Sequence, residues 1–137
     1  MSVTVKSRYA GNLRVENTHL QSGARIITDA PVDNRGKGAS FSPTDLLATS
    51  LGSCIMTIMG IKATDRDIDI TGTEVEITKI MAENPRRVDE IIVEFYFPAW
   101  AYSDEEKQFL EGLAGTSPVP LSLSADLKQT VRFHWAK

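Results

Sequence analysis

Cys54 is the only cysteine among the 137 residues of this chain, and its thiol is the side chain best suited to nucleophilic or redox chemistry. A single thiol cannot form a disulfide within the chain, so it acts with another molecule or packs as a small apolar side chain. Free cysteine is among the most buried residue types, and spacing alone favours packing. A reactive thiol instead needs a lowered pKa, which a helix N-terminus or a nearby cation supplies.

Arg35 and Asp45 are the candidate helpers of this thiol. Cys54 is about three turns into a predicted helix over 43–64, beyond the short reach of the helix dipole. Arg35 lies in the loop before that helix and can fold back over it. Asp45 precedes Cys54 by about two and a half turns, so it lies on nearly the opposite side of the helix. It could hold an arginine in place, or act on a second copy of the helix in a dimer.

The helix that positions Cys54 has a clear start signal. Ser42 can cap it, Pro43 suits its first turn, and Asp45 places a negative charge near the positive end of the dipole. One apolar face recurs at spacings of four, three and four residues, through Leu47, Leu51, Cys54 and Ile58.

A second apolar row runs beside that face, so we expect the helix to be buried on most sides. Gly52 and Gly60 lie inside it. Because a glycine in mid-helix costs about 1 kcal/mol, both suggest tight packing against another backbone.

The remaining elements predict an α+β fold of order βββ-α-ββ-α-β with an antiparallel sheet. Alternation of apolar and polar residues predicts three N-terminal strands in an antiparallel meander, over 3–9, 13–16 and 23–29. A loop over 31–42 precedes the long helix. Two long arms of a hairpin follow over 75–80 and 88–97, and Ser103 with Glu106 forms a capping box that opens a second helix. A short helical turn over 119–123 and a last strand over 127–135 complete the chain.

Composition favours a single soluble domain over residues 1–137. The chain is 42% hydrophobic and 24% charged, with a formal net charge of −3. This charge argues against a nucleic-acid binder that relies on a general positive field. The N-terminus lacks the pattern of a signal peptide, and polar residues interrupt every apolar run before it reaches membrane-spanning length. We therefore expect a cytoplasmic protein without a membrane partner. With two histidines and one cysteine, we expect neither a Cys/His zinc site nor another cofactor.

The segment around Cys54 resembles the helix signature of the OsmC/Ohr family of thiol peroxidases. That signature is a proline, an acidic residue shortly after it, a leucine-rich turn and small residues before the cysteine. Here it reads Ser42-Pro43-Thr44-Asp45-Leu46-Leu47, then Leu51-Gly52-Ser53-Cys54. The stretch Ile27-Thr28-Asp29-Ala30-Pro31, the glycine-containing loop after it and the order of elements are also similar to the family. The resemblance implies an intertwined homodimer in which each sheet wraps two central helices.

The resemblance also implies reduction of organic hydroperoxides or hydrogen peroxide. Cys54 would attack the peroxide, Arg35 would activate the thiol, and Asp45 would orient Arg35. Arg25 is the alternative to Arg35 in this role. The family's second cysteine, in a Cys-Pro-Val pattern after the second helix, falls on Ser117-Pro118-Val119. Serine cannot resolve a sulfenic acid by forming a disulfide, so an external thiol would have to reduce Cys54.

Three hypotheses follow. The first is a one-cysteine peroxidase, and the second is a non-catalytic OsmC-like dimer that binds a small apolar or electrophilic ligand. The third is an unrelated α+β monomer with a purely structural Cys54.

Overall fold

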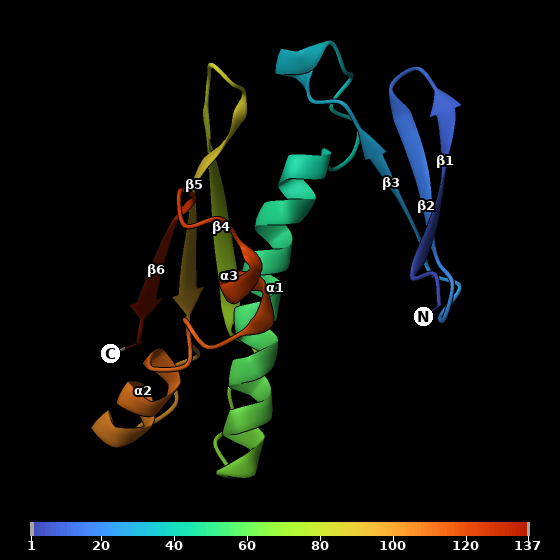
Figure 1. Cartoon of the computed structure of the whole chain (residues 1–137). Coiled ribbons are helices and arrows are strands. Elements are labelled where there is room, and N and C mark those ends of the chain that lie inside the picture. Colours follow the sequence, from blue (N-terminus) through green and yellow to red (C-terminus); the bar gives the residue numbers. More distant parts are fainter. Residues whose placement is uncertain (1, 137) are drawn as a thin grey trace. The chain divides into compact units, whose positions relative to one another are not determined.

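The computed structural model describes residues 2–136, and the chain forms two compact units, residues 1–47 and residues 48–137. The elements follow the expected α+β order, with one short 3-10 turn added (Figure 1).

The first unit is built on an antiparallel meander, as the alternating sequence predicts. It contains β1 (Val5–Gly11), β2 (Arg14–His19) and β3 (Arg25–Asp29), paired in the order β1-β2-β3. The β1–β2 turn has left-handed backbone angles at Asn12 (φ 54°) and Leu13 (φ 64°), the conformation that a tight hairpin turn requires. Every residue of β1 before Gly11 is exposed, so neither face of this strand is buried within the first unit.

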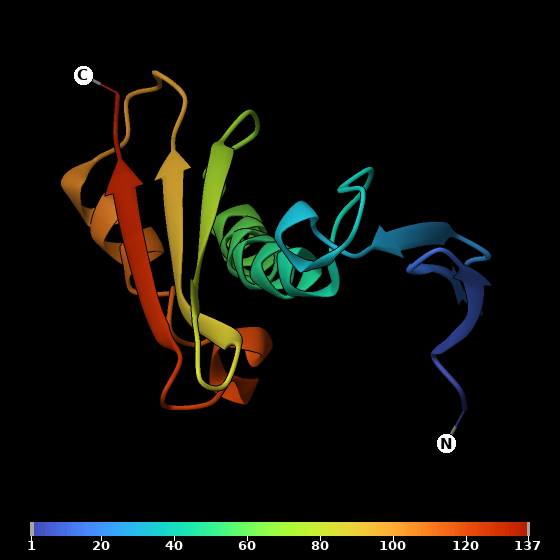
Figure 2. The same ribbon diagram turned by 90° about the horizontal axis from the view of Figure 1, so that it is seen from above.

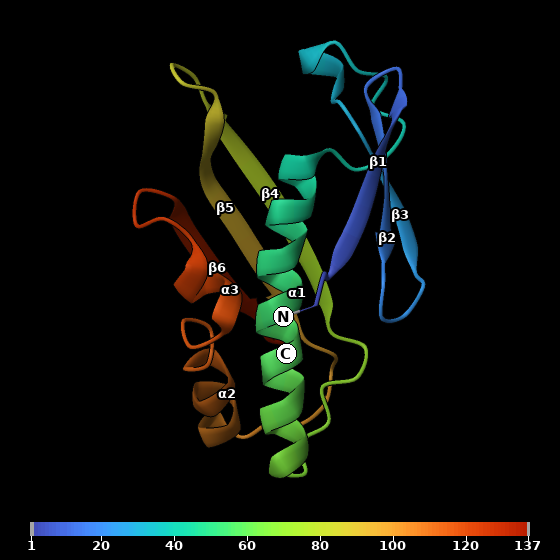
Figure 3. The same cartoon turned by 45° about the vertical axis from the view of Figure 1, so that its right-hand side comes forward.

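The second unit contains the other sheet, β4 (Glu74–Ala82), β5 (Arg87–Tyr96) and β6 (Lys128–His134), in the order β4-β5-β6. β4 and β5 form the predicted hairpin. β6 pairs parallel to β5, so the expectation of a wholly antiparallel sheet is wrong at this edge. The physical reason is the long connection after β5, because parallel neighbours need a crossover of a dozen or more residues. α2 and α3 lie in that crossover (Figure 3).

Four helical segments join the strands: η1 (Val32–Asn34), α1 (Pro43–Asp65), α2 (Asp104–Glu111) and α3 (Pro118–Ser122). The predicted capping box of α2 is confirmed. Ser103 Oγ accepts a hydrogen bond from the Glu106 backbone N–H at 3.1 Å, and the Ser103 N–H donates to Glu106 Oε1 at 2.8 Å. The predicted helical turn near 119–123 is α3.

The core of the second unit lies between α1 and the sheet. Ile91, Val93 and Phe95 of β5 are fully buried, as their alternation predicts. From α1, Leu51, Ile55 and Met59 are also fully buried and belong to the same apolar cluster. α1 runs beside β4 when the molecule is seen from above (Figure 2). An 18-residue window of α1 has a mean hydropathy of 1.5, which by length and composition would suit a membrane span, but the core helices of soluble proteins have the same property.

The buried face of α1 differs from the predicted one. The buried residues are Ala48, Leu51, Gly52, Ile55, Met59 and Ala63. Leu47 and Ile61 are exposed, and Cys54 and Ile58 are half-buried. The expectation that α1 is buried on most sides within the chain is therefore wrong, since one apolar side packs on the sheet and the other stays partly open.

Of the two helix glycines, only Gly52 fits the close-packing prediction. A Cβ at Gly52 would lie 2.5 Å from Ile77 Cδ1 of β4, whereas a Cβ at Gly60 would meet nothing within 4 Å among the described residues. Gly52 therefore lets α1 approach β4 closely, whereas tight packing at Gly60 stays a prediction.

Candidate functional site

Cys54 is a free, half-buried cysteine on α1. Its neighbours Leu51 and Ile55 are fully buried. At 100° per residue, Cys54 lies about 120° from the middle of the buried face of α1. The thiol is therefore at the border between the core and the partly open side of the helix, which is not the setting of an ordinary core cysteine.

Arg35 lies in a loop that backbone hydrogen bonds hold in one shape. The N–H groups of Asn34 and Gly36 both donate to the Pro31 carbonyl at 2.9 Å, and the Asp29 N–H donates to the Phe41 carbonyl at 3.0 Å. Gly36 has no room for a side chain, because a Cβ there would lie 1.7 Å from the Ala30 carbonyl oxygen. Arg35 itself has a left-handed backbone (φ 68°) and is exposed.

Asp45 has a structural task at the start of α1. Its N–H donates to Ser42 Oγ at 3.1 Å, and the Ser42 N–H donates to Asp45 Oδ2 at 2.9 Å. This reciprocal pair is a capping box with aspartate in place of the usual glutamate. The prediction that Ser42 caps the helix is confirmed, and Asp45 is the other half of that cap.

Ser117 is fully buried just before α3. Its Oγ has no hydrogen-bond partner among residues 2–136, and it makes no cap bond to α3. Burying a hydroxyl without a partner costs about 1–3 kcal/mol. A thiol is a weak hydrogen-bonding group that behaves as a small apolar side chain, so the surroundings of residue 117 suit a cysteine better than a serine.

These four residues are divided between the two units of the chain. Arg35 and Asp45 belong to the first unit, and Cys54 and Ser117 to the second. Contact between the Arg35 guanidinium and the Cys54 thiol stays a prediction, and so does the choice between Arg35 and Arg25, which is exposed at the start of β3. Among the described residues, no group of three or more His, Cys, Asp or Glu side chains could hold a metal ion.

Sequence reasoning missed an ion pair in the first unit. Arg14 donates from Nε and Nη2 to the two carboxylate oxygens of Asp29, at 2.8 and 2.9 Å. The hydrogen bond and charge of Arg14 lower the pKa of Asp29 below its ordinary value, and Lys37 adds to the effect. The signal was present in the sequence, because an aspartate that ends an apolar strand is rarely buried without a cation.

Comparison with known proteins extends these observations. The family model described as OsmC-like protein matches residues 36–132. A protein of Psychrobacter arcticus 273-4, described as an osmotic stress induced and detoxification response protein, has a crystal structure similar to this one. The two chains are 51% identical over 98% of this chain and 97% of the other, with a TM-score of 0.93. A comparison with curated protein sequences finds no match.

More distant structures share the fold. The OsmC-like protein of Mycoplasma pneumoniae is 18% identical, over 100% of this chain and 99% of the other, with a TM-score of 0.79. The organic hydroperoxide resistance protein OsmC of Legionella pneumophila is 15% identical, over 98% and 97% of the two chains, with a TM-score of 0.74. The family model covers well over half of this chain, and the Psychrobacter protein matches nearly all of it. The protein therefore belongs to the family of OsmC-like proteins.

Proposed function

We propose that the protein is a thiol-dependent peroxidase that uses Cys54 alone and takes its reducing equivalents from an external thiol. The observation that carries this proposal is the position of Cys54. The residue is half-buried on α1 and is not among the fully buried residues that pack α1 against the sheet. Family membership and the organic hydroperoxide resistance protein among its structural relatives support it.

The reaction has two stages. The Cys54 thiolate attacks one peroxide oxygen, the O–O bond breaks, and the other oxygen takes up a proton and leaves as an alcohol or water. Cys54 is then a sulfenic acid. An external thiol attacks its sulfur and releases water, and a second external thiol breaks the mixed disulfide and restores Cys54. The peroxide is reduced by two electrons, and two external thiols are oxidised to one disulfide.

Arg35 and Asp45 are the proposed helpers in the first stage. A guanidinium near the sulfur would favour the thiolate, and a carboxylate would orient that guanidinium. Because Asp45 also caps α1, loss of its carboxylate would weaken the helix start in any case. The matched control is Ser42→Ala, which breaks the same capping box without removing a charge.

The test is peroxide consumption by the intact protein with a dithiol reductant, together with mass spectrometry after a sulfenic-acid trap. We expect an adduct at Cys54 and loss of consumption in Cys54→Ser. Asp45→Asn should slow the reaction of Cys54 with peroxide more than Ser42→Ala does. Peroxide treatment that leaves Cys54 unmodified, with consumption unchanged in Cys54→Ser, would refute the proposal.

A second candidate is favoured by Ser117. This chain carries a buried hydroxyl where the family pattern has its second cysteine, so a non-catalytic OsmC-like protein that binds a small apolar or electrophilic ligand is the alternative. The rate of Cys54 alkylation against pH separates the two. A midpoint near the ordinary thiol pKa of about 8.5 favours the binding protein, and a clearly lower midpoint favours the peroxidase.

We also propose that the active form is a homodimer. Tyr9 and Ile26 of the first sheet and Ile61 of α1 are large apolar side chains that the chain itself leaves more than half exposed. A small sheet gains stability when an apolar face is covered, and a second copy of the chain offers matching apolar surface.

A further inference from the structure

The β1–β3 sheet has two chemically different faces, which follow from its register. Arg8 pairs with Glu16, Lys6 with Thr18, and Arg14 with Asp29. Since paired residues share a face and neighbours along a strand alternate, these side chains lie on one face, with Arg25 opposite Thr18. The other face carries mainly uncharged side chains, including Val5, Ser7, Tyr9, Val15, Asn17 and Ile26.

We call the charged side the basic face. It comprises Lys6, Arg8, Arg14 and Arg25 with the carboxylates Glu16 and Asp29, and Lys37 joins it from the loop after β3. Five cations face two carboxylates there, although the whole chain has a formal net charge of −3. Positive charge is therefore concentrated on one side of the first unit.

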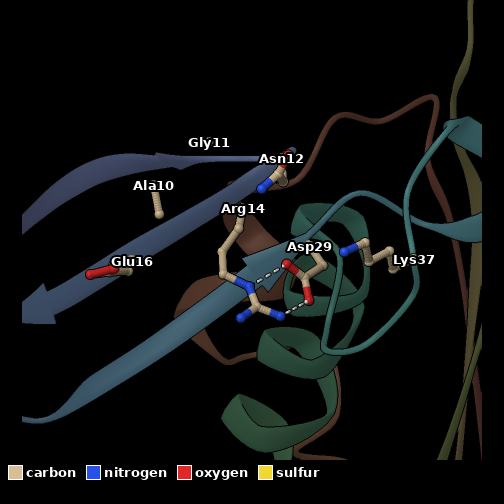
Figure 4. Close-up of a pocket in the computed structure, with 7 residues that line it drawn as sticks. All are labelled: Ala10, Gly11, Asn12, Arg14, Glu16, Asp29 and Lys37. Carbon is tan, nitrogen blue, oxygen red and sulfur yellow. Dashed lines mark hydrogen bonds and ion pairs between the residues drawn. The ribbon is translucent and has the colours of Figure 1, made fainter.

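A hollow of about 300 Å³ opens on this face beside the Arg14–Asp29 pair (Figure 4). Arg14 binds both oxygens of Asp29 through Nε and Nη2, so the carboxylate is neutralised and the guanidinium is held in one position. Figure 4 shows no bond to the third guanidinium nitrogen, and the Lys37 ammonium lies near Asp29. Two cations, Arg14 and Lys37, thus line the hollow with two carboxylates, Asp29, which Arg14 binds, and Glu16, which Arg8 binds.

A second hollow of about 220 Å³ adjoins the first. Lys6 and Arg8 line it, and Glu16 lines both hollows. Both Glu16 oxygens accept hydrogen bonds from Arg8 Nη2, at 2.9 and 3.0 Å. Glu16, the residue that lines both hollows, is therefore also paired with a cation.

We propose that the basic face binds a small organic polyanion with two or more carboxylate or phosphate groups. One group would lie between Arg14 and Lys37 in the first hollow, and another beside Lys6 and Arg8 in the second. Guanidinium and ammonium groups are the side chains that bind oxyanions most strongly. The two volumes suit a small molecule, and three short strands offer little room for the repeated phosphate contacts that nucleic acids make.

The test is calorimetric titration of the full chain at low salt with three probes: citrate, inorganic pyrophosphate and acetate. We expect citrate or pyrophosphate to bind with a Kd at least about tenfold below that of acetate, and added salt to weaken the binding. Citrate against pyrophosphate distinguishes a carboxylate ligand from a phosphate ligand.

Two exposed cations of the basic face are suitable for substitution, because neither belongs to the Arg14–Asp29 pair. Lys37→Gln and Lys6→Gln should each raise the Kd about three- to tenfold. Lys128→Gln removes an exposed lysine from the other sheet and should leave the Kd unchanged, as should Cys54→Ser.

Three results would overturn the proposal. The first is no binding of citrate or pyrophosphate at low salt, and the second is equal loss of affinity in Lys128→Gln and Lys37→Gln. The third is tighter binding of a single-stranded oligonucleotide than of either small polyanion, which would assign the basic face to nucleic acid instead.

Discussion

Ser117 shows how one atom can change both the chemistry and the stability of a site. Its hydroxyl is buried without a partner in the described part of the chain, where a sulfur atom would need none. The substitution that removes the second thiol of the family pattern therefore also leaves an unsatisfied polar group inside the second unit.

Ser117→Ala should stabilise the protein by about 1 kcal/mol, because it removes a buried hydroxyl that forms no hydrogen bond. Ser42 is the matched control, as it is buried just before a helix but forms cap hydrogen bonds. Ser42→Ala should destabilise by about 1 kcal/mol. Urea unfolding of both variants checks the pair, and a loss of stability in Ser117→Ala would show that its hydroxyl has a partner after all.

Because of Asp29, we expect the first unit to lose stability as the pH falls into the acid range. The pKa of Asp29 lies below the ordinary value of 3.8 in the folded chain, first because of the Arg14 hydrogen bond. Above 3.8 both the folded and the unfolded states are ionised, and the pair contributes fully. As pH falls below 3.8, the unfolded state takes up the proton first, and that contribution is lost.

We therefore expect the urea midpoint of the wild type to fall between about pH 4.5 and pH 3. Asp29→Asn should be less stable at pH 6 and should show a shallower fall. The fall does not vanish in the variant, because Asp69 is still present. Its pKa is also lowered, mainly by the Thr71 backbone N–H. Parallel curves for wild type and variant would contradict the assignment.

At the scale of elements, α1 has two apolar sides, and only one of them is fully covered among the described residues. One side packs on β4 and β5 within the chain, and Gly52 sets the distance of that contact. The other side, which includes Leu47, Cys54, Ile58 and Ile61, is half-buried or exposed. The helix therefore presents Cys54 at a surface that a second molecule could complete.

The two glycines of α1 allow this packing to be tested. Gly60→Ala should stabilise by about 1 kcal/mol, because alanine favours the helix and its Cβ meets nothing nearby. Gly52→Ala gains the same propensity, but its Cβ would collide with Ile77. We expect Gly52→Ala to be at least about 1 kcal/mol less stable than Gly60→Ala in thermal and urea unfolding. Equal stabilities would show that β4 can shift to admit the Cβ without loss of stability.

At the scale of the whole molecule, the chain leaves apolar surface in each unit that an isolated monomer would expose to water. Ile26 of the first unit is 53% exposed and Ile61 of the second is 51% exposed. We expect size exclusion with light scattering to give about twice the chain mass of 15.1 kDa. Tyr9→Asp and Ile61→Asp should each shift the protein towards monomer, whereas the control Arg8→Asp on the basic face should not. A monomeric wild type would refute the dimer.

Local signals in the sequence determined most of the elements and their ends. Alternation and turn residues over short spans predicted the N-terminal meander and the β4–β5 hairpin. Side chains that can form cap hydrogen bonds predicted the helix starts at Ser42 and Ser103. The structure confirms all of these. The helix signature around Cys54 likewise identified the family, because it is contiguous.

Only the tertiary structure decided which side of each element is covered. Whether Cys54 is core or border, whether β6 runs parallel, and which cation neutralises Asp29 all depend on pairings between residues far apart in the chain. An apolar face looks the same in the sequence whether its partner is the same chain or another molecule. For this reason the spacing of Leu47, Leu51, Cys54 and Ile58 predicted an apolar face correctly, but only Leu51 of these four is fully buried.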